Sequence, residues 1–420
     1  MPLLLLALTG ACATRSVRPA GDPGPTASAP VRAALSTSPS PALTVLRYGV
    51  EPELAFSPLE LEAVHLAGAL LRRPGNPPPA HSASLTLAAR ELASLAATGV
   101  RLSRARVRTA LWNAAASDPS PLWYQVSGPA GRVAEALPPL VSATSSATHL
   151  GAGVVERDGK AWLVLLASPR RAPLGPFPRA VAVGASATLE GELVTGMADP
   201  RLFITAPDGT VRERPVAGAR RFTAELRFDQ PGRWLVEVVG RGLSGPEVLA
   251  LLAVSAGAEP PSSPALAGGP DPLDPAAAED RVLAAMNATR SRHGLRELAS
   301  DPVLRKMARA QSAEMLRQGL LVHILPGSGE IGERLRRAQI PFRKALENLA
   351  RGQDALSAHE ETEESPAHLD NLLAPGPTVA GVGIARGILP GGGPVVYLTE
   401  VLVEPPVEAG SNTRNGAELR

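Results

Sequence analysis

The spacing of apolar residues changes along the chain and predicts helices in some segments and strands in others. In "ASLTLAARELASLAA", residues 83–97, apolar positions recur every three or four residues, which is the helical spacing. In "LGAGVVERDGKAWLVLLAS", residues 150–168, two apolar runs meet at Asp158-Gly159, a pair typical of a hairpin turn. Residues 45–172 are therefore predicted to form a mixed domain of helices and strands.

Between residues 178 and 256 the spacing changes to alternation. "RFTAELRFD" places its apolar residues on one face, "RWLVEVV" repeats the pattern, and "APDGT" supplies a turn. Short alternating strands at this density predict an antiparallel β-sandwich. No set of catalytic residue types clusters in this segment, so we expect it to act in spacing or docking.

The segment 273–405 begins with helical patterns and ends with strand patterns. Asp274-Pro275 is a helix start, a capping residue followed by a first-turn proline, and Gly294 fits a left-handed helix end. "SDPVLRKMARAQSAEML" predicts a second helix, and "TVAGVGIARG" and "GPVVYLTEVLVE" predict two strands joined by a glycine-rich connection. This order predicts an α+β domain, and the whole chain is predicted to be an α+β multidomain protein.

The N-terminus, "MPLLLLALTGACA", has the pattern of an export signal. Its apolar run is far shorter than the roughly 20 residues that span a bilayer, but it suits a signal peptide over residues 1–12. "LTGAC" resembles a bacterial lipobox, in which the cysteine is lipidated, and Cys12 is the only cysteine of the chain. We therefore expect an exported protein, either a membrane-anchored lipoprotein of the bacterial envelope or a secreted one; the alternative is a coincidental leucine-rich start.

Composition predicts linkers and excludes one class of partner. The chain has 43 prolines and 40 glycines among 420 residues, more than compact domains carry. We expect a disordered tether over 13–44, a linker over 257–272 and a disordered tail over 406–420. With 42 basic and 40 acidic residues, the net charge of +2 argues against a nucleic-acid partner.

The order of short motifs in residues 273–405 resembles a known family. "HGL", "VH", "ENLA", "SPAH" and "VGIA" precede a closing strand in the order found in the CAP superfamily, the group of sperm-coating, cysteine-rich secretory and pathogenesis-related proteins. The match is to its disulfide-free bacterial branch. The resemblance implies an α-β-α sandwich with an exposed cleft that holds two histidines and acidic partners.

The resemblance also implies which residues form the cleft. His323 in "LVHILP" and His368 in "SPAH" match its two histidines, and Glu347 in "LENLA" matches its first glutamate. Ser365 stands at the nearest match to the second glutamate, and Asn348 is expected to brace the backbone. The alternative is that both histidines are merely hydrogen-bonded structural residues.

Two function classes follow from these residues. Two neutral imidazoles and a carboxylate can bind a divalent metal, so His323 and His368 are candidate zinc ligands, with Glu347 as a ligand or as a hydrogen-bond partner of a histidine. A non-enzymatic module that binds an envelope lipid, glycan or protein is favoured, because no distinct nucleophile is evident and one cleft carboxylate is missing. The alternative is a metal-dependent hydrolase or peptidase with Glu347 as the base.

Other charged runs are interpreted as solvated helix faces. These are "RARVR" at 104–108, "RLRRAQ" at 334–339 and "HEETEE" at 359–364. The pair His359-Glu360 begins a zincin-like pattern, but Glu363 stands where the second histidine is required.

The segment 45–172 carries a second, weaker resemblance to the same superfamily. Its helix at 83–97 and its "LGAGVVE" hairpin resemble the second helix and the closing hairpin of the CAP domain. The segment is either a degenerate CAP-like repeat without the cleft residues or an unrelated α+β domain.

Overall fold

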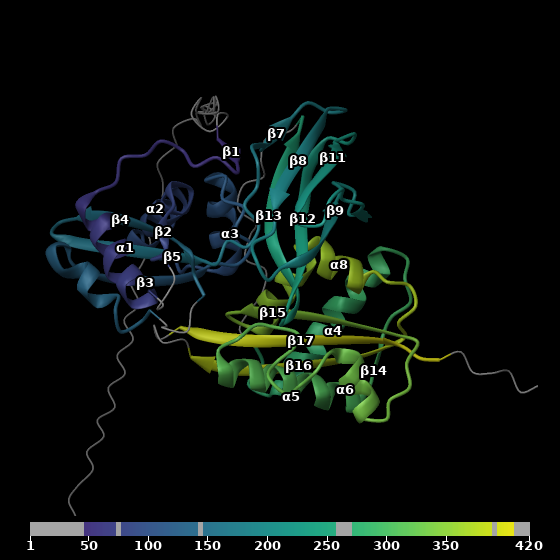
Figure 1. Cartoon of the computed structure of the whole chain (residues 1–420). Helices are drawn as coiled ribbons and strands as arrows, with labels where there is room; N and C mark the ends of the chain where they lie inside the picture. Colours follow the sequence, from purple (N-terminus) through teal and green to yellow (C-terminus); the bar gives the residue numbers. More distant parts are fainter. Residues whose placement is uncertain (1–45, 73–76, 142–145, 258–270, 389–392, 407–420) are drawn as a thin grey trace, which may run out of the picture. The chain divides into compact units, whose positions relative to one another are not determined.

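In the computed structural model three regions of the chain have their own β-sheets and are termed the N-terminal, central and C-terminal domains, and the described residues belong to one compact unit (Figure 1). The described ranges are 46–72, 77–141, 146–257, 271–388 and 393–406. The predicted signal peptide and Cys12, the tether, nearly all of the linker at 257–272 and nearly all of the tail at 406–420 lie outside these ranges. Across the described ranges, no helix is both long and apolar enough to cross a membrane.

The N-terminal domain is a four-stranded sheet covered by helices. Its helices are α1 (Pro58–Leu71), α2 (Ala83–Ala97), α3 (Arg104–Asn113) and the 3-10 helix η1 (Ala130–Ala136). Its strands are β2 (Ala80–His81), β3 (Leu122–Pro129), β4 (His149–Arg157) and β5 (Lys160–Ser168), in the order β2-β4-β5-β3. The predicted helix at 83–97 and the predicted hairpin are confirmed, because β4 and β5 pair antiparallel on either side of Asp158-Gly159.

The central domain consists of strands, as the alternation predicts. They are β7 (Ala180–Val181), β8 (Ser186–Glu192), β9 (Ala198–Thr205), β10 (Val211–Arg214), β11 (Arg221–Arg227), β12 (Gly232–Gly242) and β13 (Gly245–Ala256). They form a five-stranded sheet, β10-β9-β12-β13-β7, and a two-stranded sheet, β11-β8. One apolar cluster joins both sheets, because Phe222 and Leu226 of β11 pack in the same core as Val236 and Leu252. The short strand β1 (Arg47–Tyr48) also belongs here, since it pairs with β6 (Phe177–Pro178).

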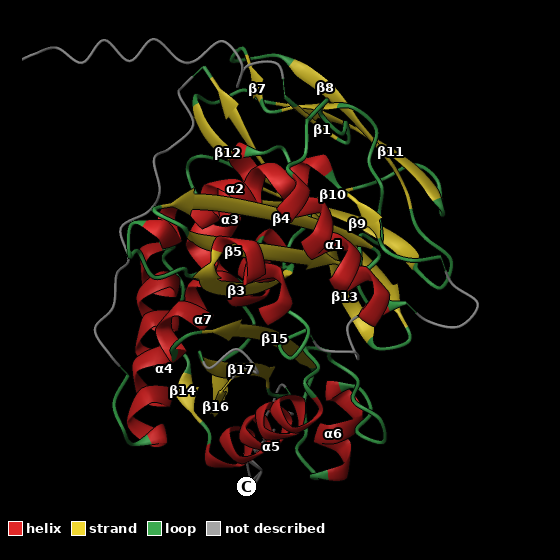
Figure 2. Ribbon diagram, turned by 90° about the vertical axis from the view of Figure 1, so that its left-hand side faces the viewer, coloured by secondary structure: helices red, strands yellow, loops and turns green. Residues whose placement is uncertain are grey.

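The C-terminal domain places helices on both faces of a second four-stranded sheet. Its helices are α4 (Pro275–Arg292), α5 (Pro302–Gln318), α6 (Ile331–Arg337), α7 (Ala355–Glu363) and α8 (Pro366–Leu372). Its strands are β14 (Ala299–Ser300), β15 (Lys344–Gly352), β16 (Val379–Ile388) and β17 (Pro394–Glu404). Figure 2 shows α5 and α6 on one side of this sheet, where they share a core with Val401 and Val403. Residues of α4, α7 and α8 pack with Leu398 and Leu402 on the other side.

Local signals set the helix ends of this domain as predicted. Asp274 caps α4 by accepting a hydrogen bond from the backbone N–H of Ala276, Pro275 is the first helical residue, and Gly294 follows the helix with a φ of 70°. Asp301 caps α5 in the same way. The two predicted closing strands are confirmed as β16 and β17, whereas β15 was not predicted as a strand.

The N-terminal and C-terminal domains share one sheet topology. The orders β2-β4-β5-β3 and β14-β16-β17-β15 correspond strand by strand, and in each sheet a two-residue strand runs parallel to its neighbour while the other pairs are antiparallel. A helix crosses each sheet at a glycine. A Cβ atom on Gly151 would lie 2.4 Å from the backbone of Leu85, and one on Gly381 would lie 2.2 Å from the backbone of Leu304.

A buried ion pair is also repeated between the two domains. In the N-terminal domain, Arg90 of α2 donates to Glu60 of α1, with Nε 2.7 Å from Oε1. In the C-terminal domain, Arg309 of α5 donates to Glu279 of α4 at the same distance. Each glutamate is buried, so each pair ties the two helices together at an equivalent place.

Candidate functional site

The predicted cleft residues converge at one edge of the C-terminal sheet. His323 lies in the loop before α6, Glu347 on β15 and His368 on α8. Nδ1 of His323 is 2.8 Å from Oε1 of Glu347, and because a carboxylate only accepts hydrogen bonds, this nitrogen carries the proton. The Nε2 atom of His323 is then the nitrogen available to a ligand.

Glu347 is held from a second side by an arginine. Arg334 of α6 donates to the Oε2 atom of Glu347, and both side chains are nearly inaccessible to solvent. The interpretation of "RLRRAQ" as a solvated face is therefore wrong for Arg334. The carboxylate of Glu347 stabilises the charge of the buried Arg334 side chain. The ion pair in turn fixes the position of Glu347.

His368 is a neutral imidazole beside His323. Burial, together with the nearby His323, lowers the pKa of His368 to about 3. Asn348 donates to the backbone oxygen of His368 at 3.1 Å. Asn371 donates to the side-chain oxygen of Asn348 at 3.0 Å and fixes the orientation of that amide.

A buried ion pair lies behind the cleft. The side-chain nitrogen of Asn348 also donates to Glu400 of β17 at 3.1 Å, and the other oxygen of Glu400 is 2.7 Å from Nδ1 of His359. Both His359 and Glu400 are almost completely buried. Burial opposes protonation of His359, but the carboxylates of Glu400 and Glu363 outweigh it and raise its pKa to about 10. The interpretation of "HEETEE" as a solvated face is therefore wrong.

A glutamate of the central domain, Glu237, contacts Ser365 of the C-terminal domain. Glu237 of β12 accepts hydrogen bonds from the hydroxyl of Ser365 and from the backbone N–H of Ala367, each at 2.7 Å. Glu237 is completely buried, and this burial raises its pKa to about 7. The acidic partner of Ser365 thus comes from the central domain.

The turn between β12 and β13 covers the loop that carries His323. Ser244 accepts a hydrogen bond from the backbone N–H of Ile324 at 3.0 Å, and Arg241 forms an ion pair with Glu330. At Gly245 the φ is +97°, and a Cβ atom would lie 3.1 Å from Cβ of His323. Only glycine fits this turn easily, because the backbone is left-handed and the approach is close.

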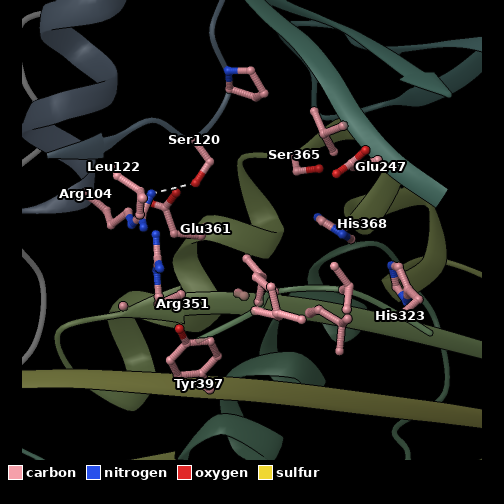
Figure 3. Close-up of a pocket in the computed structure, with 18 of the residues that line it drawn as sticks. Arg104, Ser120, Leu122, Glu247, His323, Arg351, Glu361, Ser365, His368 and Tyr397 are labelled. Atoms are coloured by element: carbon pink, nitrogen blue, oxygen red, sulfur yellow. Dashed lines mark hydrogen bonds between the residues drawn. The ribbon is translucent and has the colours of Figure 1, made fainter. Parts of the chain in front are cut away.

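These contacts border a cavity that is partly open to solvent and lined by all three domains. Its volume is about 1310 Å³. Figure 3 shows His323, His368 and Ser365 at one side of it, near Glu247 of β13, and Arg104, Arg351 and Tyr397 at the other side. The lining also includes apolar side chains, among them Leu122, which lies beside Arg104 in Figure 3, and Leu249, Leu316, Leu320 and Val322.

Two arginines of α3 lie between domains and not in solvent. The guanidinium of Arg108 is 2.8 Å from Glu361 and 3.4 Å from Glu364, both in the C-terminal domain. Arg104 is also buried, at 7% exposure, and its Nη1 atom donates to the hydroxyl of Ser120. The interpretation of "RARVR" as a solvated face is therefore wrong for both residues.

The zinc site that the sequence suggested has two imidazoles and no free third ligand. His323 and His368 contribute the imidazoles, while Glu347 is already engaged by His323 and Arg334. Within the ranges that the structure describes, no group of three or more histidine, cysteine, aspartate or glutamate residues is arranged to hold a metal ion. Zinc sites in proteins use three or four protein ligands. Zinc binding by His323 and His368 stays a prediction.

Four residues of the site were not predicted: Arg334, His359, Glu400 and Glu237. The sequence held a signal for two of them. Glu400 stands inside the apolar run "VVYLTEVLVE", where a charged residue must be paired, and His359 follows Ala355 and Ala358 at helical spacing. Glu237 lies 128 residues from its partner Ser365, and nothing in the sequence connects the two.

Comparison with known proteins agrees with the resemblance of the C-terminal domain. Residues 283–388 match the model of the cysteine-rich secretory protein (CAP) family. A stretch of 116 residues is 34% identical to the uncharacterized protein YkwD of Bacillus subtilis and covers 27% of this chain and 44% of that protein. The chain therefore spans less than half the length of this relative.

Solved structures of bacterial proteins resemble the chain at lower identity. An extracellular protein containing an SCP domain from Bacillus anthracis is 18% identical, with a TM-score of 0.28 over 55% of this chain and 68% of that one. A cysteine-rich secretory protein from Staphylococcus aureus is 11% identical, with a TM-score of 0.26 over 60% of this chain and 82% of that one.

Proposed function

We propose that this protein is an exported bacterial binding protein that holds a small ligand, a lipid or a glycan fragment, without acting on it chemically. The observation that carries the proposal is the cavity of about 1310 Å³ between the cleft histidines and the other two domains. Small-molecule sites in proteins are concave pockets that combine apolar side chains with polar groups that orient the ligand, and both kinds of side chain are present in this lining. A protein ligand fits less well, because the β12–β13 turn lies over the loop of His323.

The polar groups of the cleft are suited to orient a ligand. His368 is uncharged at neutral pH, so its ring can accept one hydrogen bond and donate another without carrying a charge into the cavity. The Nε2 atom of His323 and the oxygen of Ser365, whose own proton is donated to Glu237, are further acceptors for a hydroxyl group of a ligand. The apolar lining would take up the rest of the ligand.

A metal-dependent hydrolase remains the second candidate, with weaker support. Its mechanism needs a carboxylate that is free to take a proton from water. Glu347 accepts hydrogen bonds from both His323 and Arg334, so both of its carboxylate oxygens are already engaged.

The N-terminal domain, in this proposal, is a degenerate CAP-like repeat that has lost the cleft. The shared strand order, the paired glycines and the repeated ion pair support this origin. The strand that corresponds to β15 is β3, "LWYQVSGP", which carries neither a glutamate nor a histidine. Its role would be to close the cavity from the side opposite the histidines.

Binding of a neutral apolar fluorophore, N-phenyl-1-naphthylamine, tests the proposed function. We expect saturable binding to one site per chain. Val248→Trp places a larger side chain in the lining and should weaken binding about tenfold or more. Thr223→Trp, at an exposed position of β11 away from the cavity, is the control and should bind like the parent protein. Absence of saturable binding, or equal affinities for the two variants, would contradict the proposal.

Lipidation at Cys12 is a separate prediction about location. Metabolic labelling with a fatty acid should mark the protein, and Cys12→Ser should abolish the label and release the protein from membranes, because one or two acyl chains supply the anchor. Fractionation of labelled cells measures both effects. Membrane retention unchanged by Cys12→Ser would contradict the lipoprotein prediction.

A further inference from the structure

Two arginines meet at the end of the cavity that lies away from the histidines. Arg104 comes from α3 of the N-terminal domain and Arg351 from β15 of the C-terminal domain, and both line the cavity (Figure 3). Arg104 is buried and Arg351 is half-buried. The two positive charges lie close enough to affect each other's ionisation.

Neither guanidinium has a carboxylate within ion-pair distance among the described residues. Arg104 donates to Ser120 at 2.5 Å and lies 4.9 Å from the ring of Trp123, while Arg351 lies 5.9 Å from the ring of Tyr397. Glu361, which is near Arg104, is already paired with Arg108 at 2.8 Å.

The other arginines of the lining differ in this respect. Apart from the exposed Arg101, each has a carboxylate partner: Arg108 with Glu361, Arg170 with Asp118, Arg171 with Glu247, Arg201 with Glu213, Arg241 with Glu330, and Arg317 with Glu314.

Burial of two like charges without an anion is unfavourable in the free protein. Burial, and after it the charge of Arg351, lowers the pKa of Arg104 to about 9. Buried charges in proteins are normally paired, so an uncompensated pair facing a cavity is an arrangement in which a bound anion would remove the repulsion. Guanidinium groups bind carboxylates and phosphates through paired N–H donors, and the hydroxyl of Ser120 adds a further donor.

We infer that Arg104 and Arg351 bind the anionic group, a carboxylate or a phosphate, of an amphiphilic ligand whose apolar part lies along the cavity. This inference rests on the proposed function and narrows it to a ligand class. The apolar part would contact Leu122, Leu249 and Leu320 on the way to the histidines. The site is composite, because the N-terminal and C-terminal domains each contribute one arginine.

Calorimetric titration of the full chain with four probes tests the inference. The probes are laurate, dodecyl phosphate, the neutral ester monolaurin, and inorganic phosphate. We expect the two anionic amphiphiles to bind more tightly than monolaurin. Arg104→Gln and Arg351→Gln should each weaken the binding of the two anionic amphiphiles roughly 10- to 100-fold, because each variant loses a hydrogen bond to a charged group. The affinity for monolaurin should not change. Arg132→Gln, an exposed arginine of the N-terminal domain outside the cavity, controls for the loss of one positive charge.

The outcomes separate the inference from the proposed function. Equal affinities for charged and neutral amphiphiles, unaffected by either variant, would overturn the inference and leave the proposed function standing. No binding of any amphiphile, together with no binding of the neutral fluorophore, would overturn both. Inorganic phosphate that binds as tightly as dodecyl phosphate, with the same dependence on Arg104, would support the anion site and identify a free anion as its occupant. Arg351→Gln keeps the test decisive if Arg104→Gln fails to fold, because Arg351 is only half-buried.

Discussion

Replacing His359 by alanine is expected to lower the free energy of unfolding by about 3–5 kcal/mol, the usual cost of removing one partner of a buried ion pair. The substitution leaves Glu400 buried without its cation, 2.7 Å from the lost nitrogen. Urea denaturation of the full chain measures the effect. Glu360→Ala, a half-buried position of the same acidic run, is the matched control and should change stability by about 0.5 kcal/mol or less. Similar losses for the two variants would contradict the assignment of His359 to a buried pair.

The contribution of His359 should also depend on pH in one direction. Its pKa is raised in the folded state, to about 10 from an ordinary value of 6.5. A group of this kind stabilises the folded state fully below its unfolded pKa, and the stabilisation is lost as the pH rises through the folded pKa. The difference between the parent protein and His359→Ala should therefore shrink between about pH 7 and pH 10. A difference that stays constant over this range would show that His359 is neutral in the folded protein.

Elements set by local signals could be predicted from the sequence. Proline after a capping aspartate fixed the start of α4, and apolar alternation identified β11, because both signals act within a few neighbouring residues. The strand β15 was missed for a physical reason. It carries Glu347 and Asn348, both buried, at positions where a strand would otherwise show apolar residues. These buried polar residues thus removed the apolar pattern that predicts the strand.

Some residues of the site could likewise be predicted from the sequence, and others could not. The order of the motifs pointed to His323, Glu347 and His368. The helical spacing from Ala355 to His359 is a signal that His359 is buried, although His359 begins an acidic run. The contacts of Glu237 and of Arg108 cross between domains. They depend on how separately folded surfaces meet, and residue spacing carries no signal for that.

Replacing Glu237 by alanine is expected to loosen the contact between the central domain and α8. The substitution removes the acceptor of both the Ser365 hydroxyl and the Ala367 backbone N–H. Unsatisfied buried donors cost about 1–3 kcal/mol each, so we expect a loss of about 2–4 kcal/mol at pH 5, where the carboxyl is almost fully protonated in the folded state. Hydrogen exchange offers a local measurement, because protection of the Ala367 amide should fall by about tenfold or more. Glu225→Ala, at an exposed position of β11, controls for the loss of a glutamate from the same domain.

Replacement of Glu237 by glutamine separates the contribution of the hydrogen bonds to stability from the contribution of the ionisable charge. Burial raises the pKa of Glu237 from 4.5 to about 7, so its stabilisation is complete below its unfolded pKa and is lost as the pH rises through 7. Glutamine keeps an acceptor and a donor in the same place and does not ionise. Between about pH 4.5 and pH 8 the parent protein should therefore lose stability relative to Glu237→Gln, by up to about 3 kcal/mol for a shift of this size. Thermal unfolding of both proteins across this range measures the difference. If the parent protein instead gains stability relative to Glu237→Gln as the pH rises, Glu237 is held as a charged carboxylate, and a cation of the neighbouring domain must face it.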